Sequence, residues 1–110
     1  MWDIQMTTKV VKWYESLPEA DRAITDRMLA KLRTEGVNLK MPHSRTLKGG
    51  LFELRYTLRN GKINQRLTYC FRPESKAIIL TQFRKTRNNE ANQIRIARNL
   101  LKKLKEADND

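Results

Sequence analysis

The residues of this chain that could do chemistry are mostly cations, and they recur in its second half. Arg55 and Arg66 lie in successive segments of alternating apolar and polar residues, and Arg84, Lys85 and Arg87 follow a third, apolar segment. A guanidinium group keeps its charge and can grip two oxygens of a phosphate or a carboxylate. A lysine beside such groups can move a proton if their charges lower its pKa. These residue types therefore predict an anion site.

A hairpin fixes how Arg55 and Arg66 face each other. Apolar and polar residues alternate over 52–58 and again over 63–71, which is typical of strands with one buried face. Asn60-Gly61 between them is a strong signal for a two-residue turn, and that turn places Arg55 directly opposite Arg66. Like charges opposed across a ladder are unfavourable. We therefore expect a bound anion at this pair, which would turn the repulsion into a clamp.

A third strand brings further residues to the same face. If Arg72 pairs with Ala77 across the preceding turn, Arg66 lies opposite Phe83 and Lys85 emerges beside it. Phe83 is then positioned as a stacking surface for a base, because aromatic rings stack on unpaired bases. The register thus predicts that cations from three strands converge.

Two points stay open at this level. Arg84 points to the opposite face unless a bulge turns it, and bulges are frequent beside sites. The alternative to a site is a basic sheet face that is simply solvated. We prefer the site, because the register brings Arg55, Arg66 and Lys85 together.

The segments before the hairpin predict a pair of helices. Apolar stripes indicate one helix ending before Pro18 and a second ending at Gly36. Residues 2–6 are expected to form a short edge strand, and residues 37–50 a loop. A helix pair of this kind must bury its stripes on another element, and the predicted sheet is the element available.

A last helix follows the cationic segment, with Asn88 or Asn89 as its N-cap, and residues 106–110 are expected to fray. We therefore predict an α+β fold in which one domain spans residues 1–110. The residues expected in its core are Trp13, Ile24, Leu54, Leu67, Tyr69 and Leu80.

Composition limits the function classes. The 110 residues include 23 Lys and Arg against 12 acidic residues, a formal net charge of +11. Self-repulsion of this size indicates a polyanion or an acidic partner, with nucleic acid ranked above a membrane. No apolar run reaches the roughly 20 residues of a spanning helix, and the N-terminus lacks the pattern of a signal peptide. A cytoplasmic location is expected.

Cysteine and histidine are too few for several kinds of site. Cys70 is the only cysteine, which excludes an internal disulfide, and His43 is the only histidine, which excludes a His-pair nuclease. No Cys, His and carboxylate cluster has the spacing of metal ligands. We therefore predict neither a metal nor a cofactor.

Several segments together resemble a known group of proteins. They are GGLFELR at 49–55, RLTY at 66–69, IILTQFRKTR at 78–87, and Glu90 with Ile94 and Ala97. In this order and spacing they resemble the HigB/RelE toxins of bacteria, in particular the phage-derived, Gp49-like branch of the RelE/ParE superfamily. The resemblance spans nearly the whole chain. It implies a RelE-like fold: a helix pair on one face of a twisted antiparallel sheet, with a C-terminal helix.

The resemblance also implies a function. Many members are toxins of type II toxin–antitoxin pairs that cleave mRNA, often on the ribosome, without metal. The catalytic positions would be Arg55, Arg66, Arg84 and Lys85. Beside these positions, we expect Arg45, Lys48 and Arg87 to bind the RNA backbone and Phe83 to bind RNA by stacking. The expected partners are mRNA and a helix-turn-helix antitoxin encoded by the adjacent gene.

In such cleavage the 2′-OH attacks the adjacent phosphorus, expels the 5′-oxygen and leaves a 2′,3′-cyclic phosphate. Arg55 and Arg66 would neutralise the phosphorane, and Lys85 would stabilise it and move protons. RelE carries a tyrosine near the scissile phosphate, but residues 88–93 contain none. Some HigB-type members use histidine, for which only His43 is available, so the general base stays open.

Two other functions stay open. ParE relatives share the fold but act on DNA gyrase without cleaving RNA. A non-enzymatic protein that binds RNA or the ribosome is the third possibility.

Overall fold

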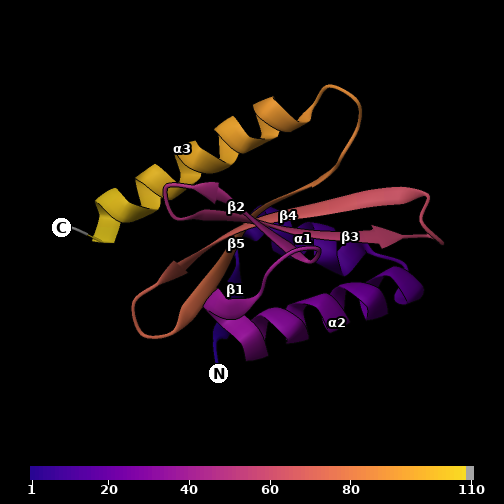
Figure 1. Cartoon of the computed structure of the whole chain (residues 1–110), viewed down its shortest axis with the longest axis horizontal. Coiled ribbons are helices and arrows are strands. Elements are labelled where there is room, and N and C mark those ends of the chain that lie inside the picture. Colours follow the sequence, from indigo (N-terminus) through magenta and orange to yellow (C-terminus); the bar gives the residue numbers. More distant parts are fainter. Residues whose placement is uncertain (109–110) are drawn as a thin grey trace.

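A five-stranded sheet lies between helices in this structure, a computed structural model in which residues 1–108 are described (Figure 1). The elements are β1 (Asp3–Met6), α1 (Thr8–Ser16), α2 (Glu19–Glu35), the 3₁₀ turn η1 (Gly36–Asn38), β2 (Ser44–Lys48), β3 (Leu51–Leu58), β4 (Ile63–Arg72), β5 (Lys76–Arg84) and α3 (Glu90–Asp108). The strand order is β1-β5-β4-β3-β2. The predicted α+β class, with a helix pair and a C-terminal helix, is confirmed.

The sheet is mixed, whereas the sequence predicted an antiparallel one. β2, β3, β4 and β5 pair antiparallel, but β1 pairs parallel with β5. Parallel pairing needs a long connection, and here the chain from β1 to β5 passes through the helix pair and all the other strands. The predicted edge strand at residues 2–6 is present as β1.

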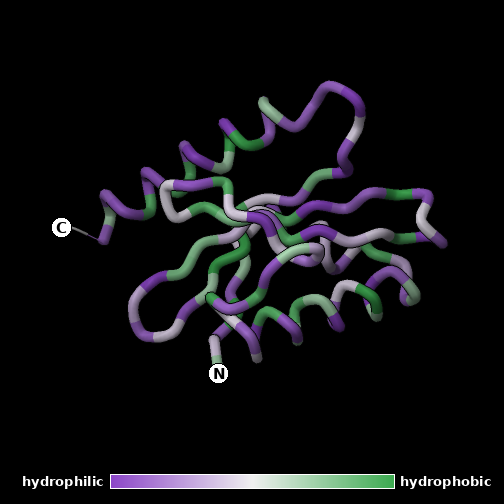
Figure 2. The backbone as a smooth tube through the Cα atoms, in the orientation of Figure 1, coloured by the Kyte–Doolittle hydropathy of each residue, from purple (hydrophilic) through white to green (hydrophobic). Residues whose placement is uncertain are grey.

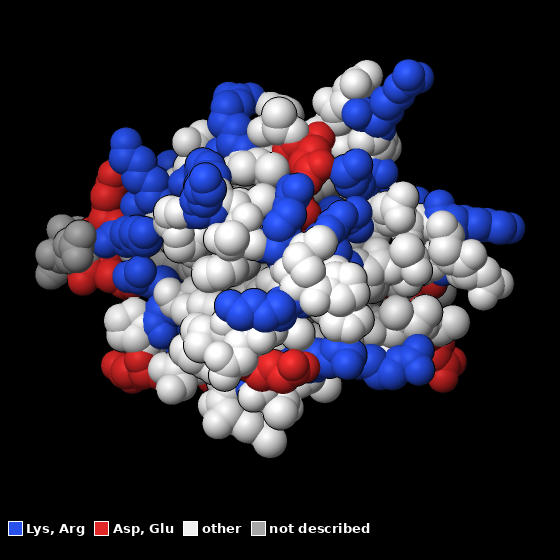
Figure 3. Space-filling view, viewed as in Figure 1, with Lys and Arg blue, Asp and Glu red and all other residues white. Residues whose placement is uncertain are grey.

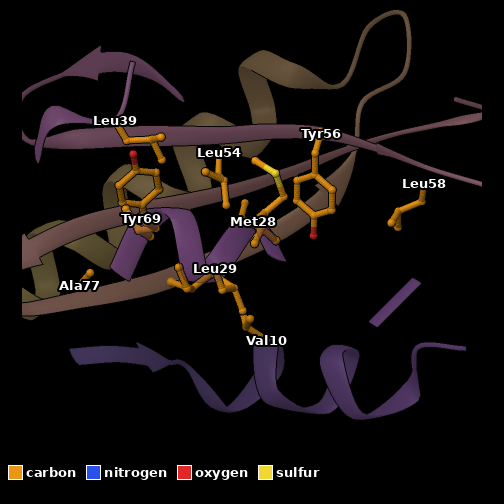
Figure 4. Close-up of a cluster of buried hydrophobic side chains, with 12 residues drawn as sticks. Val10, Met28, Leu29, Leu39, Leu54, Tyr56, Leu58, Tyr69 and Ala77 are labelled. Atoms are coloured by element: carbon orange, nitrogen blue, oxygen red, sulfur yellow. The ribbon is translucent and has the colours of Figure 1, made fainter. Parts of the chain in front are cut away.

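The first core lies between the sheet and α1 with α2 (Figure 4). Leu54, Leu67 and Tyr69 are buried there, as the alternating pattern predicted. Trp13 and Ile24 pack against this core but remain partly exposed. The green segments of Figure 2 show how apolar residues recur along both the helices and the strands.

A second core covers the opposite face of the sheet. Leu51, Cys70 and Leu80 pack there against Ala97 and Leu101 of α3. The face that was expected to be polar is therefore covered along part of its length. Its polar residues must either be buried beneath α3 or lie where the helix leaves the sheet.

The hairpin register is the predicted one, and Arg55 pairs with Arg66. The next turn differs, because Arg72 pairs with Lys76 and not with Ala77. An irregularity later in the β4–β5 ladder shifts the register by one residue, so Arg66 still faces Phe83. The bulge therefore restores the pairing of Arg66 with Phe83, on which the predicted site depends.

Residues 44–48 form an edge strand within the segment expected to be a loop. β2 pairs with β3, and Arg45 lies opposite Glu53. The strand is short and polar, and its position comes from pairing and from a hydrogen bond between the Ser44 and Tyr69 hydroxyls. The tail expected to fray is helical to Asp108, which pairs with Arg72. Residues 109 and 110 lie outside the described part of the chain.

Leu67 provides a test of the first core. Truncation to alanine should lower the free energy of unfolding by about 2–5 kcal/mol, because a fully buried leucine leaves a cavity. The measurement is urea denaturation. Val37→Ala is the control, because Val37 is 52% exposed and should change the value by less than about 0.5 kcal/mol. Equal effects of the two substitutions would contradict this packing.

Candidate anion-binding site

A fully buried carboxylate is the centre of the site. Glu53 on β3 is 0% exposed. Its Oε1 atom lies 3.3 Å from a terminal nitrogen of Arg45, 3.8 Å from Nε of Arg55 and 3.7 Å from Nε of Arg66. Burying an isolated carboxylate is very costly, so these guanidinium groups are the counter-charges that make the position tolerable.

The sheet dictates this grouping. β3 lies between β2 and β4, with Arg45 opposite Glu53 and Arg66 opposite Arg55. Glu53 and Arg55 are two residues apart on one strand, so they project from the same face. The facing arginines predicted from the hairpin thus have an anion beside them that belongs to the protein itself.

The charges of this group are matched better than its hydrogen bonds. Among residues 1–108, neither Glu53 carboxylate oxygen has a hydrogen-bond partner, and neither do the buried Nε atoms of Arg45, Arg55 and Arg66. Buried polar atoms normally have partners. These Nε atoms are themselves buried, so an added oxyanion would meet the exposed parts of Arg45, Arg55 and Lys85 and not the unpaired nitrogens.

Burial shifts the pKa values of this group. Removal of Glu53 from water, and then the nearby charge of Glu90, raise its pKa above the ordinary value of 4.5, although Arg45 and Arg66 oppose the shift. Burial and the charge of Arg55 lower the pKa of Arg66. Arginine remains protonated in proteins, so the cluster stays cationic.

A second carboxylate closes one side of the cluster. Glu90, the first residue of α3, forms a close ion pair with Arg45, and its Oε2 atom lies 3.9 Å from Nζ of Lys85. Lys85 follows β5 and is held there because its backbone N–H donates to Asn64. Side chains from β2, β3, β4 and the β5–α3 connection therefore meet at one end of α3.

Exposure separates the cationic residues of the cluster, of which Arg45 was predicted to bind RNA and the other three to be catalytic. Arg45, Arg55 and Lys85 are partly open to solvent, whereas Arg66 is only 7% exposed. Arg66 also donates from Nη1 to the Gln65 carbonyl at 3.1 Å. The first three can meet a ligand directly, and Arg66 adds its charge from beneath. In Figure 3, Lys and Arg side chains surround a small acidic patch in the upper part of the view.

The other predicted residues are more dispersed. Phe83 lies opposite Arg66 as expected, but it is 5% exposed and offers no free ring for stacking. Arg84 and Arg87 are exposed in or beside the β5–α3 connection. Lys48 lies at the far end of β2, where its carbonyl accepts from Arg98 of α3. The bulge that was considered as a way of turning Arg84 lies earlier in β5, and Arg84 itself remains paired with Gln65 in the ladder.

Sequence reasoning did not select Glu53 or Glu90 as site residues. In the sequence, Glu53 is one of several polar residues in an alternating strand. The alternation alone does not indicate that α3 covers this residue. His43 was noted as the sole histidine and the only one available as a general base. Its backbone carbonyl accepts from the Arg55 N–H at 2.8 Å, so it lies beside the cluster.

The described residues lack the features of two other kinds of site. Within residues 1–108 no group of three or more His, Cys, Asp or Glu side chains could hold a metal ion. Over the same residues no helix is both long and apolar enough to span a membrane.

Glu53 should make the protein less stable as pH rises. Its pKa is raised in the folded state, so as pH rises the unfolded chain loses this proton before the folded protein does. The free energy of unfolding therefore falls with pH between the ordinary pKa of 4.5 and the higher pKa of the folded state. Glu53→Gln should remove this part of the decline. Urea denaturation between about pH 4 and 8 measures it, with exposed Glu15→Gln as the control. An unchanged slope in Glu53→Gln would contradict the assignment.

Comparison with known proteins places the chain in a family. No curated protein matches the chain. A family model described as phage-derived protein Gp49-like (DUF891) matches residues 12–102, which is most of the chain and includes every residue of the cluster. This family is toxin-like. The chain therefore belongs to the phage-derived Gp49-like family.

Proposed function

We propose that this protein is the toxin of a type II toxin–antitoxin pair of the HigB/RelE type and that it cleaves mRNA. The observation that carries the proposal is the cluster of Arg45, Arg55, Arg66 and Lys85, in which all but Arg66 are partly open to solvent. Membership of a toxin-like family supports it. The protein would act in the cytoplasm on mRNA, on the ribosome.

The proposed reaction needs no group beyond RNA and side chains. The 2′-oxygen forms a bond to the adjacent phosphorus, and the bond to the 5′-oxygen breaks. The products carry a 2′,3′-cyclic phosphate and a 5′-hydroxyl. A proton leaves the 2′-OH and another reaches the 5′-oxygen, while negative charge accumulates on the phosphorane.

The cluster is suited to that charge. Arg55 is partly exposed and can bind the non-bridging oxygens through its guanidinium fork. Arg66 stabilises the same charge from the buried side, and preorganised charges of this kind supply much of enzymatic rate enhancement. Lys85, which contacts the cluster through Glu90, and His43, whose backbone carbonyl accepts from the Arg55 N–H, would be the candidates for moving protons.

The partner would be a helix-turn-helix antitoxin encoded by the adjacent gene. A net charge of +11 would speed its association with an acidic surface at low salt. Co-expression of the neighbouring gene should restore the growth of cells that produce the toxin.

The function itself is tested by the products of cleavage. Purified protein should cut mRNA on translating ribosomes and leave a 2′,3′-cyclic phosphate, and any cut of ribosome-free RNA should persist in EDTA. A 2′-deoxy substitution at the cleaved position should block the cut, because it removes the nucleophile. In cells, mapping 5′ ends after induction should show new ends in mRNA. Growth arrest without new ends would contradict the nuclease and favour a gyrase-directed toxin.

Arg55 and Arg66 should contribute cooperatively. In single-turnover cleavage each alanine substitution should cost about 10²–10³-fold, the range for loss of one transition-state donor. The double substitution should cost less than the product of the two, because both act on one phosphate. Near-additive, small losses that added salt reproduces would indicate a solvated basic face instead.

The same variants should differ in stability. Arg66→Ala should destabilise the fold more than Arg55→Ala, because Arg66 is the more buried counter-charge of Glu53. Relief of the Arg55–Arg66 repulsion would act the other way. Thermal denaturation compares the two, and a gain in stability in Arg66→Ala would show that repulsion dominates.

A further inference from the structure

Glu90 is a member of the cluster to which the proposed chemistry assigns no role. It is the first residue of α3, and its side chain extends to Arg45 of β2, a residue far away in sequence. Its second oxygen lies 3.9 Å from Nζ of Lys85. The carboxylate thus lies between two cations from different elements, both of which are partly exposed.

A carboxylate resembles a phosphodiester in the features that these cations recognise. Each group presents two oxygens that share one negative charge, and a guanidinium binds either through charge-assisted hydrogen bonds. The contacts that Glu90 makes with Arg45 and Lys85 are therefore contacts that a phosphate could take over.

The charge balance permits such an exchange. The cluster has four cations and two carboxylates: Arg45, Arg55, Arg66, Lys85, Glu53 and Glu90. A phosphodiester carries one negative charge, so its entry with withdrawal of Glu90 leaves the net charge unchanged. Entry with Glu90 in place would instead bring a third anion beside Glu53 and Glu90, and like charges at close range repel.

The surroundings of Glu90 allow it to withdraw. Its side chain is partly open to solvent, whereas that of Glu53 is fully buried. The preceding connection, residues 84–88, is exposed. Asn89 holds the backbone in place by donating to the Arg84 carbonyl and accepting from the Thr86 N–H. Rotation of the Glu90 side chain would therefore suffice, without movement of the helix.

We propose that Glu90 is a built-in competitor that occupies Arg45 and Lys85 in the free protein and is displaced by the phosphate of the RNA substrate. The inference rests on the proposed function, because it takes the cluster to be the phosphate site. The ion pairs that Glu90 makes hold the cationic side chains in place before substrate arrives. They also lower the apparent affinity for phosphate, because only the molecules in which these pairs are open can bind it.

The test measures anion binding without cleavage. Wild-type protein, Glu90→Gln and Glu90→Asp are titrated with inorganic phosphate at constant ionic strength, and the midpoint of thermal unfolding is followed, since a ligand of the folded state raises it. A 2′-O-methyl RNA oligonucleotide, which cannot be cleaved, is titrated in parallel by fluorescence anisotropy. Glu106→Gln is the matched control: it makes the same charge change in α3, is exposed, and lies about 24 Å along the helix from Glu90.

Glu90→Gln should bind phosphate and the oligonucleotide about three- to tenfold more tightly than wild type, the range expected when partly exposed ion pairs no longer compete. Without phosphate it should melt at a lower temperature, because the cations lose a counter-charge. Glu90→Asp keeps the charge but shortens the side chain, so it should shift affinity in the same direction by less. It also provides the measurement if Glu90→Gln does not fold. Glu106→Gln should change affinity less than about twofold.

Two results would overturn the inference, and they are distinguishable. If wild type binds phosphate in a manner that Arg55→Ala abolishes, but the Glu90 variants match Glu106→Gln, Glu90 is no competitor and the proposed function stands. If neither wild type nor the Glu90 variants bind phosphate or the oligonucleotide, the proposed function fails and this inference fails with it.

Discussion

Burial of the Glu53 carboxylate is the interaction on which the candidate site depends. A buried carboxylate requires its counter-charges to stay close to it, because removal of one of them leaves the carboxylate uncompensated. Arg45, Arg55 and Arg66 are therefore held by one group, from three adjacent strands. The same arrangement leaves guanidinium nitrogens without hydrogen-bond partners within residues 1–108. Burial of one carboxylate in the sheet thus holds three guanidinium groups close together.

The placement of α3 decides where this cluster ends and where solvent begins. Its apolar stripe packs on Leu51, Cys70 and Leu80 and forms the second core. Its first turn carries Glu90 to the rim of the cluster. The bulge in β5 keeps Arg66 opposite Phe83 and lets Lys85 follow on. Packing at one end of the helix and charge pairing at the other are thereby linked through a rigid element.

Local and overall charge differ in this protein. The whole chain carries +11, which favours approach to any polyanion and gives no preference for a position. At the cluster, two carboxylates offset part of the positive charge, one buried and one at the rim. The long-range field and the local geometry therefore have separate tasks. The field raises the rate of encounter with a polyanion at any position, and under the proposed function the cluster would be the place where a phosphate is held.

The sequence by itself determined the elements with strong local signals. Alternation and Asn60-Gly61 fixed the hairpin and hence the Arg55–Arg66 pair, since a tight turn leaves one register. Only the tertiary structure decided the rest of the site. β2, the burial of Glu53 and the contact of Glu90 with Arg45 join residues distant in the chain. Local patterns carry no information on such contacts, because they depend on which face α3 covers and on pairing partners that the chain brings together only when folded.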